Sequence, residues 1–261
     1  MPRKKIKLIT LDLDDTLWPN KKVIVDAENA WLNFILTKFP NLVEEFSEES
    51  LSRVRVELIE KNPSLKSDLT SFRKEIIKET LLKSGIDSVD AIYYSNESFN
   101  EFFRVRNKVQ LYTDAKKILE RLYRKVMIGT LSNGNADLEI IGISEFFQFS
   151  ICSKDVGSNK PSPPHFDKAL EIANCLPEEA LHIGDCPVND IGGARNCNFN
   201  TIWFNCDRNK WDEIFPCDLQ AKSWKDLYQT INKNFILEKV DNILEFLELT
   251  PVISFNNTVK W

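Results

Sequence analysis

The chain has 261 residues, of which 43% are hydrophobic and 28% charged, and its formal net charge is −5. This length can bury a complete α/β core and still include a second, smaller module. The acidic balance argues against a polyanion-binding protein, so we predict no nucleic-acid partner. No stretch reaches the ~18 uninterrupted apolar residues of a membrane-spanning helix, so we predict no membrane partner either. Composition leaves the oligomeric state open.

The cysteines indicate a reducing environment. All six lie in the second half of the chain, and no two form a C-x-x-C pair, which argues against a zinc site. Because no secretory signal is recognisable, we do not expect a disulfide framework. We therefore expect free thiols and a cytoplasmic protein. The six are Cys152, Cys175, Cys186, Cys197, Cys206 and Cys217.

The first predicted element is a buried strand over Ile6–Leu13, where the apolar run is nearly continuous. From about residue 22 to 107 the pattern becomes helical, and apolar residues such as Ala27 and Trp31 recur at helical spacing. We predict an all-helical insert of four or five helices. The expected domains are a core of residues 1–20 and 108–261 and a helical domain of residues 21–107.

Strands and helices alternate after the insert, which predicts a doubly wound α/β core whose parallel sheet is covered on both faces. A ligand then binds at the carboxyl ends of the strands. The predicted strands are Val126–Leu131, Phe147–Cys152, Ala180–Ile183 and Thr201–Phe204. The predicted helices are Ala115–Arg124, His165–Ala173, Asp190–Asn196 and an amphipathic tail over Ile236–Leu249.

Asp12 and Asp14 come at the end of the first predicted strand. Residues i and i+2 of a strand point the same way, so the two carboxylates should project side by side. Such a pair is unfavourable unless one carboxyl is protonated or a cation lies between them. One use of the pair is a nucleophile beside a general acid. The alternative is that the D-D-T sequence simply forms a turn or a helix cap.

Three further segments come after predicted strands. Ser132 and Asn133 begin a Ser-Asn-Gly segment, which is either a plain turn or a phosphate grip made of a hydroxyl and backbone N–H groups. Lys160 precedes a proline and, by itself, reads as a surface charge. Asp185 and Asp190 follow the strand that ends in L-H-I-G, at the same predicted sheet edge. Oxygen ligands from two strand ends suit Mg²⁺.

In this order the four segments closely resemble the motifs of the haloacid dehalogenase-like superfamily of phosphohydrolases, over residues from about 6 to 227. The resemblance implies a Rossmann-like core, with the helical insert as a C1-type cap. Asp15 departs from it, since glycine is frequent there, and His165 stands where an apolar residue is usual. We interpret His165 as a surface or packing residue at the start of a helix, and His182 as a core histidine inside its strand. The residues that match the motifs are Asp12, Asp14, Thr16, Ser132, Lys160, Asp185, Asn189 and Asp190.

The resemblance also implies a role for each matching residue. Asp12 is the implied nucleophile, which forms an aspartyl-phosphate, and Asp14 is the implied acid and base. Mg²⁺ is the implied cofactor, held by Asp12, the backbone carbonyl of Asp14 and Asp185. The implied phosphate-binding residues are Thr16, Ser132, Asn133 and Lys160, and Lys160 is also counted as catalytic. Asn189 and Asp190 would orient Lys160 or metal-bound water from behind.

The implied function is hydrolysis of a small phosphomonoester. The insert between Pro63 and Leu82, together with the D-L-D-D-T-L-W and L-S-N-G-N segments, resembles more loosely a subgroup that acts on FMN and on the phosphorylated ribitylaminouracil precursor of riboflavin. In that subgroup's terms Arg73 would contact the substrate; the alternative is that it faces water. Related caps serve sugar phosphates and nucleotides, so the substrate stays open.

Other functions fit the same motifs less well. A phosphomutase keeps both aspartates and stays an alternative. A dehalogenase lacks the second aspartate, because a halide leaving group needs no proton, whereas Asp14 is present here. A binding protein without catalysis on the same fold is the third alternative. Such a protein would be expected to have lost at least one of four motif residues, and none is missing. The four are Asp12, Asp14, Lys160 and Asp185.

Overall fold

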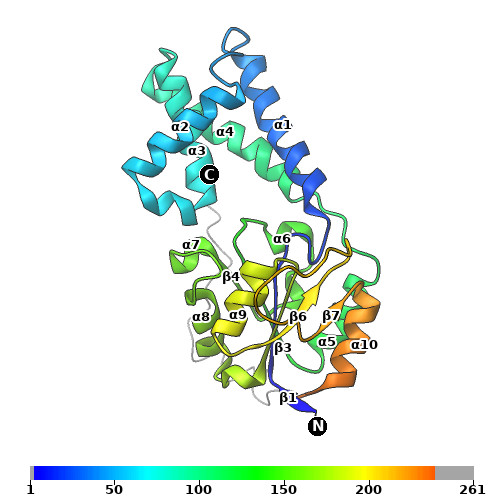
Figure 1. Cartoon of the computed structure of the whole chain (residues 1–261). Coiled ribbons are helices and arrows are strands. Elements are labelled where there is room, and N and C mark those ends of the chain that lie inside the picture. Colours follow the sequence, from blue (N-terminus) through cyan, green and yellow to red (C-terminus); the bar gives the residue numbers. More distant parts are fainter. Residues whose placement is uncertain (1–2, 239–261) are drawn as a thin grey trace.

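The computed structural model describes residues 3–238 and shows a parallel α/β core with a helical domain above it (Figure 1). The main sheet has six strands, each parallel to its neighbours. In spatial order they are β4 (Phe149–Cys152), β3 (Met127–Ser132), β2 (Leu8–Leu11), β5 (Ala180–Gly184), β6 (Asn200–Phe204) and β7 (Gln220–Ala221). A separate two-stranded sheet pairs β1 (Lys4–Ile6) with β8 (Phe235–Leu237).

The predicted first strand is in fact two strands, because the chain changes partners at Lys7. Before this residue the chain pairs with β8, and after it β2 pairs with β3 and β5. The Lys7 N–H donates to the carbonyl oxygen of Glu179 at 2.8 Å, and its ammonium lies 2.7 Å from the Glu179 carboxylate. β2 then ends at Leu11, so Asp12 begins the following loop.

Helices cover both faces of the sheet (Figure 1). On one face, α5 (Ala115–Tyr123) and α10 (Trp224–Asn234) bury apolar stripes against the strands. On the other face, α8 (Pro164–Ala173) and α9 (Gly193–Asn196) pack into a separate apolar cluster. The short helices α6 (Leu138–Ile141) and α7 (Ser153–Val156) follow β3 and β4. The core is thus a three-layer structure. The edge at which the strands of its main sheet end faces the helical domain (Figure 1).

The helical domain, which we call the cap, has its own apolar core. Its α-helices are α1 (Asn20–Lys38), α2 (Glu48–Lys61), α3 (Leu69–Lys83) and α4 (Ser88–Arg106), and the 3₁₀ segment η1 (Pro63–Ser67) precedes α3. The side chains of Ser47, Asp68 and Asp87 accept N–H groups at the starts of α2, α3 and α4. Such caps each contribute about 1 kcal/mol. Local sequence therefore fixes where these helices begin.

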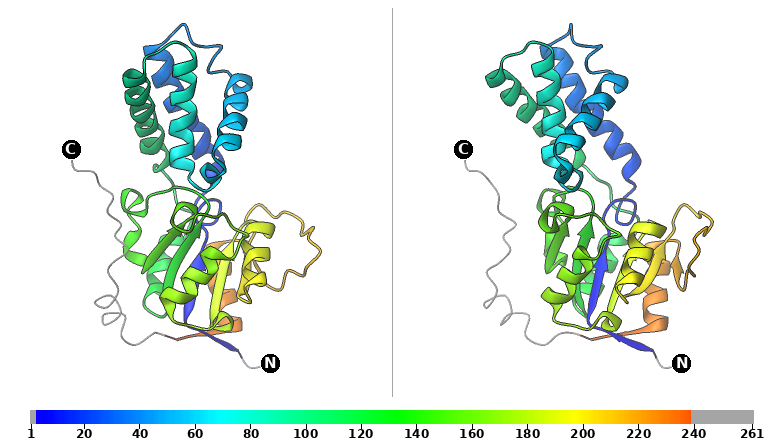
Figure 2. Two further views of the ribbon diagram at one scale, coloured as in Figure 1. Left: turned by 90° about the vertical axis from the view of Figure 1, so that its left-hand side faces the viewer. Right: turned by 60° about the vertical axis from the view of Figure 1, so that its left-hand side comes forward.

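The cap joins the core through two adjacent connections (Figure 2). The Tyr112 N–H donates to the carbonyl oxygen of Leu17 at 2.9 Å, which ties the outgoing connection to the returning one. Loops of the core reach the cap as well. The Asn159 amide donates to the Lys66 carbonyl oxygen at 3.0 Å. The cap is therefore docked over the edge of the sheet in this structure.

The predicted α/β fold with its doubly wound parallel sheet is confirmed. Four α-helices span residues 20–106, and the division into a core of 1–20 and 108–261 and a cap of 21–107 stays our interpretation. The predicted helix at 190–196 begins earlier, as a π-helical turn over Pro187–Gly192 that continues into α9. The predicted tail helix over Ile236–Leu249 is wrong at its start, which lies in β8, and its remainder from residue 239 lies outside the described residues. None of the described helices is long and apolar enough to cross a membrane.

Candidate active site

Acidic and polar side chains gather where the three central strands end. β2 lies between β3 and β5, and the chain continues from β2 to β3 on one side of the sheet and from β5 to β6 on the other. This is the topological switch point, at which ligands bind in doubly wound folds. Asp12 follows β2, Ser132 ends β3 and Asp185 follows β5. The sheet therefore brings together segments that are far apart in the sequence.

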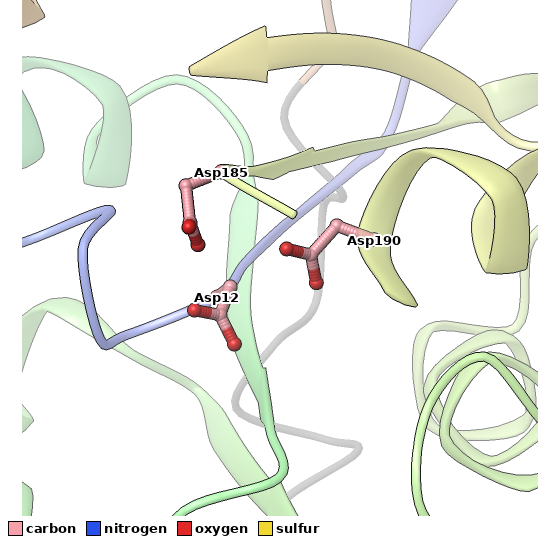
Figure 3. Close-up of side chains that lie close together, drawn as sticks. All are labelled: Asp12, Asp185 and Asp190. Carbon is pink, nitrogen blue, oxygen red and sulfur yellow. The ribbon is translucent and has the colours of Figure 1, made fainter. Parts of the chain in front are cut away.

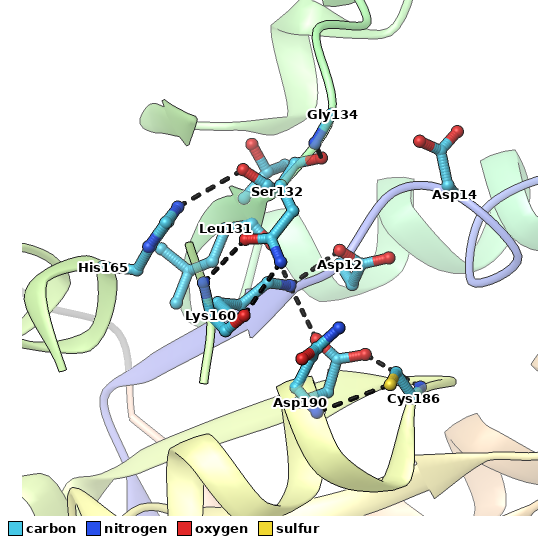
Figure 4. Close-up of polar contacts among 12 residues, drawn as sticks. Asp12, Asp14, Leu131, Ser132, Gly134, Lys160, His165, Cys186 and Asp190 are labelled. Atoms are coloured by element: carbon cyan, nitrogen blue, oxygen red, sulfur yellow. Dashed lines mark hydrogen bonds and ion pairs between the residues drawn. The ribbon is translucent and has the colours of Figure 1, made fainter. Parts of the chain in front are cut away.

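The ammonium group of Lys160 lies in the middle of this site (Figure 4). Its Nζ donates to Asp12 Oδ1 at 2.7 Å and to Asp190 Oδ1 at 2.6 Å, and a third bond at 2.5 Å goes to the Leu131 carbonyl oxygen. The Lys160 side chain is only 2% exposed. Burial lowers the pKa of this lysine, but Asp12 and Asp190 outweigh burial and raise it above its usual range. Lys160 is therefore a fixed cation, unlike the surface charge that its sequence context alone would suggest.

The backbone of Lys160 is held by the side chain of Asn133. Asn133 Oδ1 accepts the Lys160 N–H at 2.7 Å, and its Nδ2 donates to the Lys160 carbonyl oxygen at 3.0 Å. Ser153 Oγ adds a contact of 3.2 Å to the same oxygen of Asn133. The two predicted phosphate-binding segments are thus joined, and the Asn133 side chain is engaged with protein. The side chain positions Lys160, and only the backbone of Asn133 is available to an anion.

Asp12, Asp185 and Asp190 converge from three segments (Figure 3). Each offers one carboxylate oxygen, and these oxygens lie within 4.8 Å of one another. Burial raises the pKa of Asp185 to about 7, with help from the negative charges of Asp190 and Asp15. Burial also raises the pKa of Asp12, against the effect of Lys160. Three carboxylates that face one lysine are a hard, oxygen-rich set in need of further positive charge, which fits a magnesium ion.

The position of Asp190 depends on a glycine. A Cβ at Gly184 would lie 2.3 Å from the Asp190 side chain, so only glycine lets this carboxylate approach β5. The Cys186 N–H donates to Asp190 Oδ2 at 2.9 Å, and His182 Nε2 lies 3.3 Å from Oδ1. Burial alone would raise the pKa of Asp190, but Lys160 and His182 hold it below its usual range. Asp190 is thus an ionised anchor for Lys160.

Asp14 lies apart from Asp12, contrary to the expectation of two parallel side chains (Figure 4). The reason is that β2 ends at Leu11, so the alternation of a strand no longer applies. The next residue, Asp15, adopts φ = 56°, a left-handed conformation that Asp tolerates better than most residues. This explains an aspartate where the motif often has glycine. Asp15 Oδ1 also accepts the Asn20 N–H at 2.8 Å and so holds the start of α1.

The carboxylate of Asp14 is instead bound by Arg106, the last residue of α4. Arg106 Nη2 lies 2.7 Å from both oxygens of Asp14, and Trp18 Nε1 donates to Oδ1 at 3.0 Å. Burial raises the pKa of Asp14, although Arg106 and Trp18 act in the opposite direction. Our sequence analysis missed Arg106. Nothing in its local pattern marks a residue 92 positions away from its partner, and only the folded chain brings the two together.

The remaining predicted site residues lie in different surroundings. Thr16 is fully buried and its Oγ1 has no partner among the described residues. Ser132 Oγ accepts the Gly134 N–H at 2.9 Å. Asn189 is half-buried in the turn after β5. Arg73 lies within the cap, where its Nη2 is 2.5 Å from Glu28 Oε1. Their predicted roles stay predictions.

The two histidines are buried, which confirms the core position expected for His182 and favours packing over a surface position for His165. His182 Nδ1 lies 2.8 Å from Thr10 Oγ1, and His165 Nε2 lies 3.3 Å from the carbonyl oxygen of Ser132. Burial and the nearby Lys160 charge lower the pKa of His165 to about 4. Burial likewise lowers the pKa of His182. Both rings are therefore neutral near pH 7.

A capped α/β core with carboxylates and a buried lysine at its switch point defines a class of group-transfer hydrolases. The chain belongs to the haloacid dehalogenase-like hydrolase family, whose model matches residues 6–198. The predicted family and enzyme class are confirmed. The chain is 30% identical over 202 residues to the 5-amino-6-(5-phospho-D-ribitylamino)uracil phosphatase YigB of Escherichia coli, with 77% of this chain and 84% of that protein covered.

Two further comparisons extend this result. A glyceraldehyde 3-phosphate phosphatase of Pyrococcus furiosus is 28% identical, and the match covers 94% of each chain. The crystal structure of a 2-haloacid dehalogenase from Pseudomonas syringae superposes with a TM-score of 0.84 at 33% identity, over 87% of this chain and 99% of that one. By name, the two curated relatives are phosphatases and the protein of similar structure is a dehalogenase.

Proposed function

We propose that the chain is a magnesium-dependent phosphatase that hydrolyses a small phosphomonoester through an aspartyl-phosphate on Asp12. The observation that carries the proposal is the contact of 2.7 Å between Asp12 and Lys160, beside Asp185. A nucleophilic carboxylate next to a fixed cation and an acidic metal-type set suits attack on a phosphoryl group. A surface ion pair would need none of these neighbours.

In the first step the Asp12 oxygen attacks phosphorus, and the bond from phosphorus to the ester oxygen breaks. Asp14 supplies the proton that the leaving alcohol takes away. In the second step Asp14 takes a proton from water, which attacks the phosphoenzyme and releases inorganic phosphate and free Asp12. Lys160 binds a phosphoryl oxygen and is kept in place by Asp190. Ser132 and the backbone N–H of Asn133 bind another.

The set of Asp12, Asp185 and the Asp14 backbone carbonyl would hold Mg²⁺, which neutralises phosphate charge and stabilises charge in the transition state. Asn189 and Asp190 would support this set from behind. The fit rests on the converging carboxylate oxygens of Asp12, Asp185 and Asp190, and on the raised pKa of Asp185. Thr16, whose buried Oγ1 has no partner among the described residues, would contribute to phosphate binding.

For the substrate we propose a ribityl phosphate of the FMN or riboflavin-precursor type. The support is the YigB phosphatase, which is named for such a precursor. Arg73 is our proposed cap contact. Its guanidinium stacks 3.7 Å from the centroid of the Phe102 ring and pairs with Glu28. A substrate that binds Arg73 would therefore have to share the guanidinium with Glu28 or displace the Glu28 carboxylate from it. We place the activity in the cytoplasm, which suits six free thiols.

The test is a phosphate-release screen with Mg²⁺ across FMN, the ribitylaminouracil phosphate, glyceraldehyde 3-phosphate and nucleoside monophosphates, ranked by kcat/KM. We expect turnover that EDTA abolishes and that Asp12→Asn lacks. Absence of EDTA-sensitive phosphate release from every compound and from p-nitrophenyl phosphate would overturn the proposal in favour of a binding protein. Activity only in the presence of a sugar bisphosphate would favour a phosphomutase.

The similar dehalogenase structure makes halide release a second candidate. Asp14 argues against it, because a halide leaves without a proton, whereas this chain places a carboxylate beside the site and binds it with Arg106. Incubation with a 2-haloacid and detection of free halide decides between the two. We expect none. Halide release that survives Asp14→Asn would support the dehalogenase.

A further inference from the structure

Arg106 connects the cap to the acid/base residue of the core. It is the last residue of α4, whereas Asp14 lies in the loop after β2. The guanidinium is buried, with 1% of the side chain exposed, and its side-chain hydrogen bonds to described residues all go to Asp14. Its Nη1 is buried without a partner among those residues. The burial of this cation is therefore explained by one carboxylate.

The Asp14 carboxylate is held in one place by three contacts. Two come from Arg106 at 2.7 Å each, and the third comes from Trp18 at 3.0 Å. On another side the carboxylate lies very close to Gly134. A Cβ at this glycine would lie 2.8 Å from Asp14 Oδ2 and 3.3 Å from Ser132 Oγ. The carboxylate therefore packs against the Ser132–Gly134 segment, which is proposed to bind phosphate.

A buried ion pair is weak evidence of a contribution to stability, because apolar residues of similar volume often do as well. A general acid, in contrast, must lie within hydrogen-bond reach of the leaving oxygen, and small misplacements are costly. The geometry of Arg106 answers the second need. Its hydrogen bonds reach both oxygens of Asp14, and together with the Trp18 contact to Oδ1 they fix the position and the orientation of the carboxylate.

We propose that Arg106 is a positioning residue for proton transfer, which fixes the Asp14 carboxylate toward the leaving group when the cap is docked. This inference rests on the proposed phosphatase function, since it assigns Asp14 a leaving-group proton. Arg106 acts through Asp14 and does not touch the phosphoryl group. Its loss should therefore slow the first step only as far as the leaving group needs a proton, whereas any effect on the second step, in which Asp14 takes a proton from water, is the same for every substrate.

The experiment compares phenyl phosphate with p-nitrophenyl phosphate, which differ mainly in the basicity of the leaving group. Phenolate is the more basic and depends more on the acid. Arg106→Met should lower the rate of phosphoenzyme formation from phenyl phosphate, measured by rapid mixing as the first release of phenol, by about 10- to 100-fold, which is part of the ~10²–10⁴-fold that general acid catalysis contributes. It should lower the same rate for p-nitrophenyl phosphate by much less, and it should leave KM nearly unchanged. Arg106→Lys, which keeps a cation near Asp14, should recover part of the loss.

The matched control is Arg104→Met on the same helix, where Arg104 is half exposed and pairs with Glu101. This control variant should change the rate with neither substrate. Arg106→Met in an Asp14→Asn background should add almost nothing to the loss, and this double variant leaves no buried charge unpaired, so it should fold even if the single variant is unstable.

Equal losses on both substrates, additive losses in the double variant, or a loss that lies mainly in KM would each overturn the proposal. The last of these would make Arg106 a substrate-binding cation. Wild-type protein without Mg²⁺-dependent release of nitrophenol would instead overturn the phosphatase function itself.

Discussion

Two charged groups at the site differ in how their charge is balanced. The core cluster of Asp12, Asp185, Asp190 and Lys160 has three carboxylates for one ammonium. The Asp14–Arg106 pair has one of each. An excess of buried negative charge calls for a metal ion or a protonated carboxyl, whereas a balanced pair calls for neither. The charge balance therefore favours cation binding by the first group and a fixed geometry for the second.

The sharpest contrast concerns the two aspartates. Asp12→Asn should abolish turnover of every substrate, because an amide cannot form the acyl-phosphate. Asp14→Asn should depress hydrolysis of alkyl phosphates, whose alkoxides need a proton, far more than that of p-nitrophenyl phosphate, with ~10²–10⁴-fold available. Rapid mixing should show a burst of nitrophenol in Asp14→Asn and none in Asp12→Asn. The reverse pattern would exchange the two roles.

Removal of the cation from the core cluster should give the largest loss of stability. Lys160→Met leaves Asp12 and Asp190 buried without their shared partner, and breaking such a pair costs about 3–5 kcal/mol. Denaturation in urea measures it. Adding Asp190→Asn should restore part of the loss, since it removes one of the unpaired charges. The control is Lys168→Met, a surface residue paired with Glu171, where about 0–1 kcal/mol is expected. A loss no larger than this control would show that the cluster is solvated.

The sequence was enough to predict the core cluster and not enough to predict the pair. Asp12 and Asp185 directly follow β2 and β5, and parallel strands bring their carboxyl ends to one edge, while Lys160 and Asp190 belong to motifs at fixed places in the order of segments. Asp12, Lys160 and Asp185 could therefore be placed from strand order and motif alone, although their roles stay predictions. The pairing of Arg106 with Asp14 depends on how α4 returns to the core, which no local pattern encodes.

Local backbone geometry accounts for the other differences. The loop after β2 begins at Asp12, two residues earlier than the apolar run to Leu13 suggests, and the loop points Asp14 away from Asp12 (Figure 4). The apolar run does not show that the chain changes partners at Lys7, because apolar residues stand on both sides of it, Ile6 at the end of β1 and Leu8 at the start of β2. Asn133 is equally hidden, since an Asn-Gly pair reads as a turn while its side chain clamps Lys160.

A cation should stabilise the core cluster and leave the pair unaffected. Mg²⁺ should raise the thermal midpoint of the wild-type protein, by an amount that corresponds to about 2.7 kcal/mol at a concentration 100 times Kd. Asp185→Ala should remove this shift and should not destabilise the metal-free protein, because it relieves repulsion. Asp207→Ala, an exposed acid after β6, is the control and should keep the shift. A full shift in Asp185→Ala would exclude Asp185 as a ligand.

The smallest effect concerns His165, which lies behind the core cluster and reports on its charge. Burial and Lys160 lower its folded pKa from 6.5 to about 4, so the folded ring stays neutral while the unfolded ring takes up a proton below about pH 6.5. Between these values the unfolded state binds more protons, and the contribution of His165 to stability is lost as the pH falls from about 6.5 to 4.

His165→Leu removes this dependence. The difference in unfolding free energy between wild type and variant should therefore be constant above pH 7 and shift in favour of the variant by at most about 3 kcal/mol at pH 4. Urea denaturation at several pH values measures it, and the other acidic groups cancel because both proteins contain them. Parallel pH profiles would mean that the folded ring binds a proton as readily as the unfolded one. The positive charge of Lys160 would then not reach it, and the core cluster would be less strongly polarised than its geometry indicates.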